Sequence, residues 1–441
     1  MKSPIPLGSK ESLEEATVKS SLWVRYKNTI NFKTDLKSIF IRPHARFATL
    51  DGARAITILF MVLFHVLFGI AKILDDKVEG FIANFPGYLN WMWQAQGSDP
   101  LFVMCGLLVS YSLFREYDRS QSLDVMRFFK RRLMRIYPLF LLALLIFLPT
   151  NSRHDGYILS NLLFASNYFE GQKPIIPVGW SLEVQMQFYF LLPFICLLMY
   201  KIRWRIPFLV GLCIAAVAYR YWWTANHPEL YITPFYEVVY NRDFARLLSD
   251  HLYYDLDARI GAFFMGMLVA YLHHYYGKAM VEYFKRNRLV NVIILFLGIY
   301  LIAWSFTFPL INKEDDFYAP FDPQANMMFL VFNRYAYSFG MSILLLMALC
   351  PVGPSRVVKW ILSWPIWHPF AQLIFSIYLF HFVFIVFGAA IAFGTLDKDS
   401  ITSASILQVF GVYFWALVLT IIFSTFAHIY IEGPFLKLRE G

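Results

Sequence analysis

Apolar residues stand in long continuous runs along this chain, and shorter polar segments separate the runs. The stretch "AITILFMVLFHVLFGIA" is typical of them. Such runs have roughly the 20 residues that an α-helix needs to cross a hydrocarbon core about 30 Å thick, whereas the strands of membrane barrels are shorter and alternate. The pattern therefore predicts an all-α, polytopic integral membrane bundle of about ten transmembrane helices, near residues 53–73, 100–114, 136–150, 180–200, 206–222, 258–276, 289–307, 327–350, 370–392 and 406–430.

Composition points the same way. The chain is 58% hydrophobic and 16% charged, whereas soluble domains carry about 25% charged residues, so an ordinary soluble enzyme is excluded. A net charge of +9 would suit nucleic-acid binding. The charges, however, alternate with the apolar runs as membrane topology requires, so we expect the lipid bilayer and no nucleic acid among the partners.

Lysine and arginine predict the orientation. Segments on the N-terminal side carry about three times as many of them as the opposite segments, which places both termini in the cytoplasm; an odd error in the span count would reverse this. Residues 1–46 are polar and lack an early apolar core, so we expect a cytoplasmic tail and no signal peptide. Its stretch "SLWVRYKNTINFKTDLKSIF" is either a surface-lying helix or flexible. Residues 47–441 then form one membrane domain.

The other charged and sulfur-containing residues limit the possible chemistry. The four cysteines lie in or beside apolar runs without close pairing, so we expect neither a disulfide framework nor a metal site. The non-cytoplasmic segments 151–178, 223–257 and 308–326 are rich in aromatic residues, asparagine and proline. They could shape a site for an acceptor.

The first span carries two ionisable groups on one helix face. Arg54 and His65 are eleven residues apart, which is about three turns and about 16 Å along the axis. An ionisable side chain at the membrane centre costs about 2.5–3.5 kcal/mol and is usually functional. The alternative is that Arg54 anchors the helix end and His65 forms a packing hydrogen bond.

Asp99 opens the second span and has two possible roles. It could orient the imidazole of His65 through a hydrogen bond. It could also cap the helix, because it directly precedes Pro100, a preferred first helical residue. Both roles stay open on the sequence alone.

A cluster of cations precedes the third span in "FFKRRLMRIYPLF". Lys130, Arg131, Arg132 and Arg135 lie at the end of the predicted cytoplasmic loop 115–135. A solvated positive-inside cluster explains them without any function. Together with Arg54 they would also bind a multiply phosphorylated group.

The fourth span opens with several polar residues, in "PVGWSLEVQMQFYFLLPF". Trp180 and Tyr189 are typical interfacial aromatics. Glu183 and Gln187 share a face at a spacing of four residues, and Gln185 points nearly opposite.

Later spans add further candidates. Arg259 could pair with Asp257 at the mouth of the sixth span, and Tyr378 and His381 share one face of the ninth. The remaining intramembrane or interfacial charges are Arg334 in the eighth span and Glu432 near the C-terminus.

Six motifs, in order, resemble the acyltransferase family 3 membrane proteins. They are Arg54-x10-His65, "SDPLFVMCGLL", "RRLMRIYPLF", "WSLEVQMQFYFLLP" (which includes Ser181), "FSIYLFHF" and "YIEGPFLK". Three departures from the family pattern stand out. Cys105 replaces a serine, Gln185 stands where the family usually has glutamate, and the soluble esterase-like domain of some members is not expected here.

The resemblance implies a bacterial inner-membrane O-acyltransferase. It would move an acyl group, most simply acetyl, from cytoplasmic acyl-CoA to a hydroxyl of a carbohydrate or glycolipid such as a surface polysaccharide or lipopolysaccharide. Acetyl-CoA would be a co-substrate, and no permanently bound cofactor is expected. Arg54, Arg131, Arg132 and Arg135 would hold the coenzyme A phosphates and His65 would be the general base, with Asp99 and Glu183 as the other catalytic candidates.

Two rival functions remain possible on the sequence. Buried arginine, histidine and glutamate would suit an ion-coupled secondary transporter, although the chain lacks the internal repeats typical of carriers. An inactive acyltransferase-like scaffold is the other rival, and Gln185 is the residue that favours it.

Overall fold

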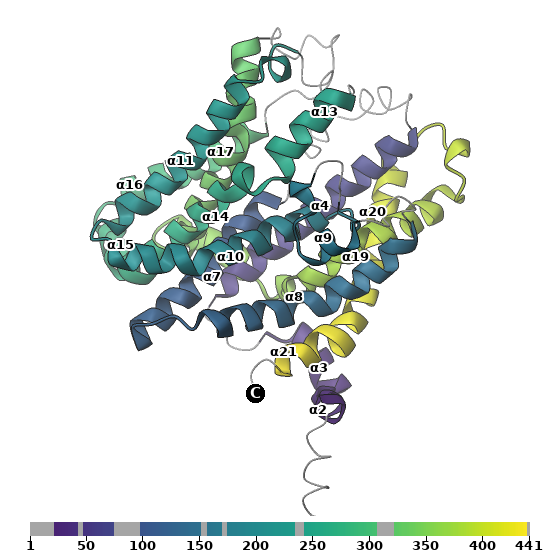
Figure 1. Cartoon of the computed structure of the whole chain (residues 1–441), viewed down its shortest axis with the longest axis horizontal. Coiled ribbons are helices and arrows are strands. Elements are labelled where there is room, and N and C mark those ends of the chain that lie inside the picture. Colours follow the sequence, from purple (N-terminus) through teal and green to yellow (C-terminus); the bar gives the residue numbers. More distant parts are fainter. Residues whose placement is uncertain are drawn as a thin grey trace, which may run out of the picture.

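The computed structural model describes residues 22–42, 47–74, 98–150, 157–169, 174–233, 242–306 and 322–438, and every regular element in these ranges is a helix (Figure 1). The long helices are α4 (Ala48–Leu74), α7 (Ser98–Ser120), α8 (Val125–Phe147), α10 (Gly179–Lys201), α11 (Arg205–Ala225), α14 (Leu256–Tyr271), α16 (Arg288–Ser305), α17 (Pro323–Leu349), α19 (His368–Phe393) and α20 (Ile406–Ala427).

Shorter helices join them or lie at the ends of the bundle. The α-helical ones are α2 (Leu22–Thr29), α3 (Phe32–Phe40), α9 (Ile158–Leu162), α13 (Arg242–Ser249), α15 (Gly277–Arg286), α18 (Ser355–Leu362) and α21 (Gly433–Leu438). The 3₁₀-helices are η2 (Leu148–Thr150), η3 (Ser166–Tyr168), η4 (Pro228–Leu230), η7 (Pro365–Trp367) and η8 (Lys398–Ser400). The π-helices are η5 (Asp250–Tyr254), η6 (Leu272–Tyr276) and η9 (His428–Glu432).

Each predicted span overlaps one long helix. Within the described ranges, eight helical stretches are long and apolar enough to cross a membrane. The chain is therefore a multi-pass integral membrane protein, as predicted. The two other long helices, α7 and α8, have 23 residues each, which is about 34 Å at 1.5 Å per residue.

The predicted loop 115–135 is wrong. The second helix continues to Ser120, and α8 begins at Val125, where the side chain of Asp124 caps it by accepting a hydrogen bond from the Arg127 N–H. The arginine-rich segment is therefore the first half of a helix, because a helix cap and regular spacing outweigh its low hydropathy.

Glycines allow the backbones of α7 and α14 to touch. A Cβ atom added to Gly106 would overlap the carbonyl oxygen of Phe263, and one added to Gly266 would overlap that of Val103. Small residues commonly allow such close approach between membrane helices, where packing rather than the hydrophobic effect holds helices together. This pair forms a fixed wall at the centre of the bundle.

The two ends of the described chain lie at the same end of the bundle (Figure 1). The Nζ of Lys437 lies 2.6 Å from the Asp35 carboxylate and 2.6 Å from the carbonyl oxygen of Thr29. The N-terminal stretch is thus helical where it is described, and its position on a lipid surface stays a prediction. The shared position of the ends agrees with an even number of crossings, and the cytoplasmic placement of that end stays a prediction.

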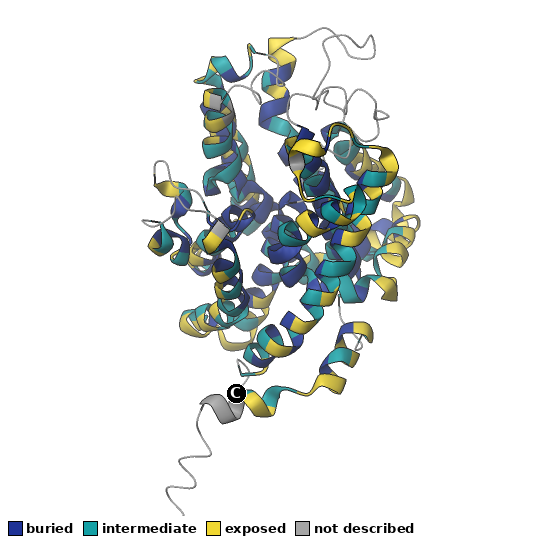
Figure 2. Ribbon diagram, turned by 90° about the vertical axis from the view of Figure 1, so that its right-hand side faces the viewer, coloured by how far each residue is buried: buried dark blue, intermediate teal, exposed yellow. Residues whose placement is uncertain are grey.

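Buried residues fill the middle of the bundle and exposed ones lie on its outer faces (Figure 2). Many exposed side chains are large and apolar, such as Phe190, Phe296 and Phe414. In a membrane protein these side chains face lipid, so their exposure has no solvation penalty. The buried polar residues in the interior therefore mark where function is to be sought.

Candidate active site

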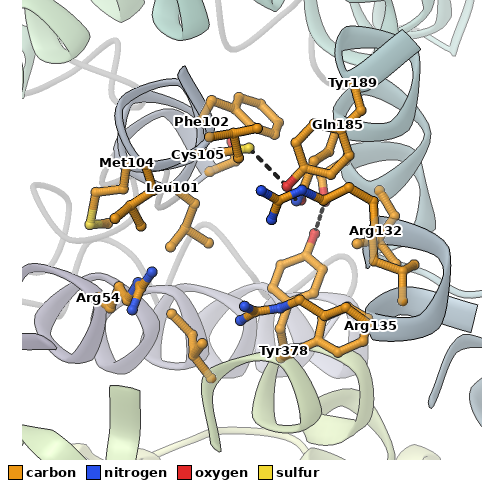
Figure 3. Close-up of a pocket in the computed structure, with 18 residues that line it drawn as sticks. Arg54, Leu101, Phe102, Met104, Cys105, Arg132, Arg135, Gln185, Tyr189 and Tyr378 are labelled. Atoms are coloured by element: carbon orange, nitrogen blue, oxygen red, sulfur yellow. Dashed lines mark hydrogen bonds between the residues drawn. The ribbon is translucent and has the colours of Figure 1, made fainter. Parts of the chain in front are cut away.

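A cavity of about 280 Å³ lies between α4, α7, α8, α10 and α19 (Figure 3). Its lining includes three arginines, Arg54, Arg132 and Arg135, whose guanidinium groups surround the same space (Figure 3). None of its described lining residues is a carboxylate. We refer to this space as the cationic cavity.

Two arginines of the cationic cavity have no direct ionic partner among the described residues. Arg54 is half-buried, and neither it nor Arg135 has a hydrogen bond or an ion pair with a described residue. The guanidinium carbon of Arg132 lies 5.4 Å from the ring centres of both Phe128 and Tyr189. Like charges gathered around one space attract an anionic ligand.

Arg131 does not belong to this group. Its guanidinium pairs with Glu116 at 3.2 Å on the outer side of α8, and Lys130 is exposed. Arg132 and Arg135 line the cavity and Arg131 does not, although its spacing of four residues places Arg131 on the same side of the helix as Arg135. Of the four arginines predicted to hold the donor, three line this cavity, and their role stays a prediction.

Two departures from the family pattern meet in the cationic cavity. The thiol of Cys105 donates a hydrogen bond to the Tyr189 hydroxyl at 3.2 Å, and the side-chain amide of Gln185 donates to the same hydroxyl (Figure 3). The predicted opposition of Gln185 to Glu183 is confirmed, because only Gln185 lines this cavity. The two unusual residues thus form one hydrogen-bonded unit with Tyr189.

A second cavity, of about 740 Å³, lies further along α4 and is bounded by α19, α20 and η5. The residues described at its wall include no carboxylate, carboxamide or guanidinium group but do include Lys72, whose Nζ lies 4.5 Å from the ring centre of Phe68. Two groups of rings line this cavity: His65 contacts Phe382, and Trp180 contacts Tyr253 and Tyr254. We refer to this space as the histidine cavity.

The partner of His65 is His381. The Nδ1 of His65 lies 2.9 Å from the Nε2 of His381, which is fully buried. The Nδ1 of His381 lies 2.8 Å from the carbonyl oxygen of Tyr378. A carbonyl only accepts, so in the neutral ring this nitrogen carries the proton and Nε2 accepts from His65. This assignment leaves the lone pair of His65 on Nε2.

Two hydroxyl groups at the wall of the cationic cavity lie near residues of the histidine cavity, since the Tyr378 ring centre is 6.3 Å from that of His381, the partner of His65. Ser181 and Tyr378 are hydrogen-bonded to each other and line the cationic cavity (Figure 3), and the Tyr378 hydroxyl also donates to the Val178 carbonyl at 2.9 Å. Trp180, the neighbour of Ser181, lines the histidine cavity instead. We refer to Ser181 and Tyr378 as the partition.

Asp99 does not orient His65. Its buried carboxylate accepts from Arg259 at 3.0 and 3.3 Å and from Arg334 at 3.1 Å. Two cations compete for one carboxylate at this depth, and an ion pair outweighs a bond to a neutral imidazole. The predicted contact with His65 is therefore wrong.

The arginines of this cluster support the histidine cavity. The guanidinium of Arg259 lies 4.4 Å from the ring centre of Tyr253 and 5.2 Å from that of Trp180. Arg334 lies 4.8 Å from the same tyrosine ring. The suggested ion pair between Arg259 and Asp257 is also absent, because Asp257 accepts from the Tyr219 hydroxyl at 2.6 Å.

Glu183 holds a loop and lines neither cavity. Its carboxylate accepts from the Ser166 hydroxyl at 2.6 Å and from the backbone N–H groups of Ser166 and Asn167. Gln187 donates to the Phe164 carbonyl and to the Asn167 side chain, so the predicted shared face of Glu183 and Gln187 is confirmed. Both side chains fasten the segment around η3 to α10.

Glu432 is also remote from both cavities. Its buried carboxylate lies 2.8 Å from the Nδ1 of His428 within η9. Tyr253, Tyr254 and Phe382, by contrast, line the histidine cavity but were not singled out from the sequence. The aromatic richness of residues 223–257 was the available signal for the two tyrosines.

Comparisons with known proteins agree with the motifs. A family model described as an acyltransferase domain matches residues 47–426. A Staphylococcus aureus (strain COL) protein with a provisional O-acetyltransferase name is 25% identical over 88% of this chain and 57% of its own length. The O-acetyltransferase OatA of S. aureus (strain NCTC 8325 / PS 47) is 31% identical over 33% of this chain and 24% of its own.

The share of each chain that is matched decides how far the comparisons apply to this protein. The chain spans a little over half the length of the first of these relatives. No solved structure matches it. The family model, however, covers most of the chain, including both cavities and the partition, and on this ground the chain belongs to acyltransferase family 3.

Proposed function

We propose that this protein is a membrane-bound O-acyltransferase that moves an acyl group, most simply acetyl, from acyl-CoA to a hydroxyl of a carbohydrate or glycolipid. The observation that carries the proposal is that two unlike cavities are lined by the same helices, α4, α10 and α19, with Ser181 at the wall of one and its neighbour Trp180 at the wall of the other. One cavity gathers three arginines, of which Arg54 and Arg135 have no ion pair with a described residue, and the other presents an imidazole with a free lone pair. A two-substrate transfer needs one site of each kind.

The cationic cavity is the proposed donor site. Arg54, Arg132 and Arg135 would bind phosphate oxygens of coenzyme A, for which guanidinium groups provide paired donors. Ligand pockets typically measure about 300–1,000 Å³, so 280 Å³ suits part of this large molecule rather than all of it. The excess of lysine and arginine on the terminal side favours opening toward the cytoplasm.

His65 is the proposed general base. Its Nε2 would accept the proton of the acceptor hydroxyl while that oxygen attacks the thioester carbonyl, forming the ester bond. The carbon–sulfur bond breaks, and the thiolate of coenzyme A leaves and receives the proton from the imidazolium. General base catalysis contributes about 10²–10⁴-fold. His381 acts as a positioning residue, because it accepts from Nδ1 and thereby fixes the reactive nitrogen.

The partition must open for this reaction. The thioester would reach the Ser181 and Tyr378 hydroxyls from one side, while His65 lies on the other. Movement of the Tyr378 side chain would join the two spaces. A closed partition in the absence of acceptor would keep water from the thioester and limit its hydrolysis.

The test uses purified protein in lipid nanodiscs with acetyl-CoA and membranes from the source cells as acceptor. We expect free coenzyme A to appear with an equal amount of acetyl ester, and only when both substrates are present. Solute movement across proteoliposomes without release of coenzyme A would identify a carrier. Absence of both activities would identify a scaffold.

A further inference from the structure

The histidine cavity has two chemically different parts. One contains His65 and the aromatic rings of Trp180, Tyr253 and Tyr254. The other is a stripe of aliphatic side chains on three helices, namely Ile70 and Ile73 of α4, Ile385, Val386, Ala389 and Ala390 of α19, and Val412 of α20.

The aliphatic stripe runs along the helices away from His65. The two histidines are paired, and four residues later on each helix Gly69 and Ile385 are again neighbours, since a Cβ on Gly69 would lie 3.5 Å from Ile385. The helices α4 and α19 are therefore parallel here. From His65 to Ile73 is eight residues, so the stripe is about 12 Å long.

A water-soluble saccharide would bind poorly along this stripe. Each sugar hydroxyl that leaves water without a new hydrogen bond costs about 1–3 kcal/mol. The aliphatic side chains of the stripe offer no donor or acceptor, and apart from the ring-bearing residues only Lys72, Ser249 and Thr395 do so among the described lining residues. A hydrocarbon chain has no such penalty, and its contact with the stripe contributes through close packing.

The stripe also reaches the outer surface of the bundle. Val386 lines the cavity and is 59% exposed, and its neighbour Phe387 is 52% exposed. Both lie on α19, which is among the most apolar candidate spans. An exposed apolar edge at this position faces lipid, so a ligand with a hydrocarbon chain can enter sideways from the bilayer.

We propose that the acceptor is an amphipathic glycolipid rather than a free sugar or a soluble polysaccharide. Its sugar ring lies against Trp180, Tyr253 and Tyr254, because aromatic faces bind the C–H face of a sugar. Its reacting hydroxyl meets His65, and its hydrocarbon chain follows the stripe. This inference rests on the proposed acyltransferase function and specifies the substrate of that site.

The first experiment follows the acetyl group. Purified wild-type protein is incubated briefly with radiolabelled acetyl-CoA and membranes from the source cells, and the products are partitioned between chloroform–methanol and water. We expect the ester label in the organic phase. Ester label confined to water-soluble products would overturn the glycolipid acceptor but keep the transferase. Label in neither phase would overturn the proposed function, and the acceptor with it.

The second experiment fills the stripe. Ala390→Phe places a large ring at the half-buried end of the stripe, and Ile391→Phe places the same ring on the adjacent exposed position outside the cavity. We expect Ala390→Phe to lower transfer to the organic phase at least about tenfold by raising KM for the acceptor, with KM for acetyl-CoA unchanged. Ile391→Phe should behave as wild type.

Equal activity of the two phenylalanine variants would overturn the proposed path of the chain. A thermal unfolding profile of each variant in nanodiscs checks that the bundle is intact. If Ala390→Phe does not fold, the phase of the wild-type product still decides the proposal.

Discussion

The cationic cavity and the histidine cavity are built on the same helices but differ in chemistry. Both use α4 and α19 as walls, and residues eleven apart on α4 open into one and then the other. The first collects three arginines, and the second has aromatic and aliphatic walls around one imidazole. One helix stripe can therefore serve two substrates when a partition divides it.

The difference also explains where charge is tolerated inside the bundle. The Asp99 cluster satisfies its buried cations with a carboxylate and aromatic faces. Arg54 and Arg135 have no such partner among the described residues. An uncompensated cation in a membrane protein marks a ligand site, whereas a paired one stabilises structure.

The largest expected loss of activity follows from changing His65, the proposed general base in the histidine cavity. His65→Ala should lower kcat by about 10²–10⁴-fold, because proton removal from the acceptor hydroxyl is lost. Coenzyme A release from purified protein measures this. His428→Ala is a matched control, since that histidine pairs with Glu432 away from both cavities. A fully active His65→Ala protein would end the assignment.

The next largest effect is expected on KM for acyl-CoA, and it should differ between Arg54 of α4 and Arg131 of α8. Arg54→Ala should raise KM for acyl-CoA by about 10–100-fold, the loss of one charged hydrogen bond pair worth about 1.5–3 kcal/mol, with KM for the acceptor unchanged. Arg131→Ala should change either constant by less than about threefold, because Arg131 lines neither cavity and its ion pair with Glu116 is partly exposed to solvent. Equal effects of both changes would remove the distinction between inner and outer arginines.

A smaller effect is expected at the positioning histidine. His381→Phe removes the acceptor of the His65 Nδ1 proton and should lower kcat about tenfold, in line with the loss of one buried hydrogen bond. His381→Gln retains an acceptor oxygen and should recover most of that rate at the same KM for acyl-CoA. Failure of glutamine to recover it, with both variants stable, would argue against the positioning role.

The smallest effect on the reaction is expected at Glu183, which lies outside both cavities. Glu183→Gln should keep kcat within about threefold but lower the free energy of unfolding by about 1–3 kcal/mol, because its three donors lose a charged acceptor. Thermal unfolding and coenzyme A release measure the two quantities together. A large loss of kcat at unchanged stability would contradict this structural role and support a catalytic role for Glu183.

Long apolar runs predicted the helices well, because span length is a physical requirement of the bilayer. The prediction that residues 115–135 form a loop was wrong. Hydropathy alone assigns such a polar, arginine-rich segment to a loop, but most of it is helical. Spacing on one helix was equally reliable. It placed Arg54 and His65 along one stripe, and Glu183 and Gln187 on one face.

Contacts between helices could not be read from the sequence. The pairing of His65 with His381 joins residues 316 positions apart, and the pairing of Asp99 with Arg259 and Arg334 joins three helices. Nothing local in the chain selects His381 over Asp99 as the partner of His65. The side of α8 that faces inward, and therefore the arginines that line the cationic cavity, likewise depends on tertiary packing.

A cryo-electron microscopy structure with a non-hydrolysable acetyl-CoA analogue tests the central claim most directly. The account predicts density for the phosphates among Arg54, Arg132 and Arg135, with the acyl end of the analogue at the Ser181–Tyr378 pair. Phosphate density beside His65, or bound outside α8 near Arg131 and Glu116, would contradict the assignment of the two cavities.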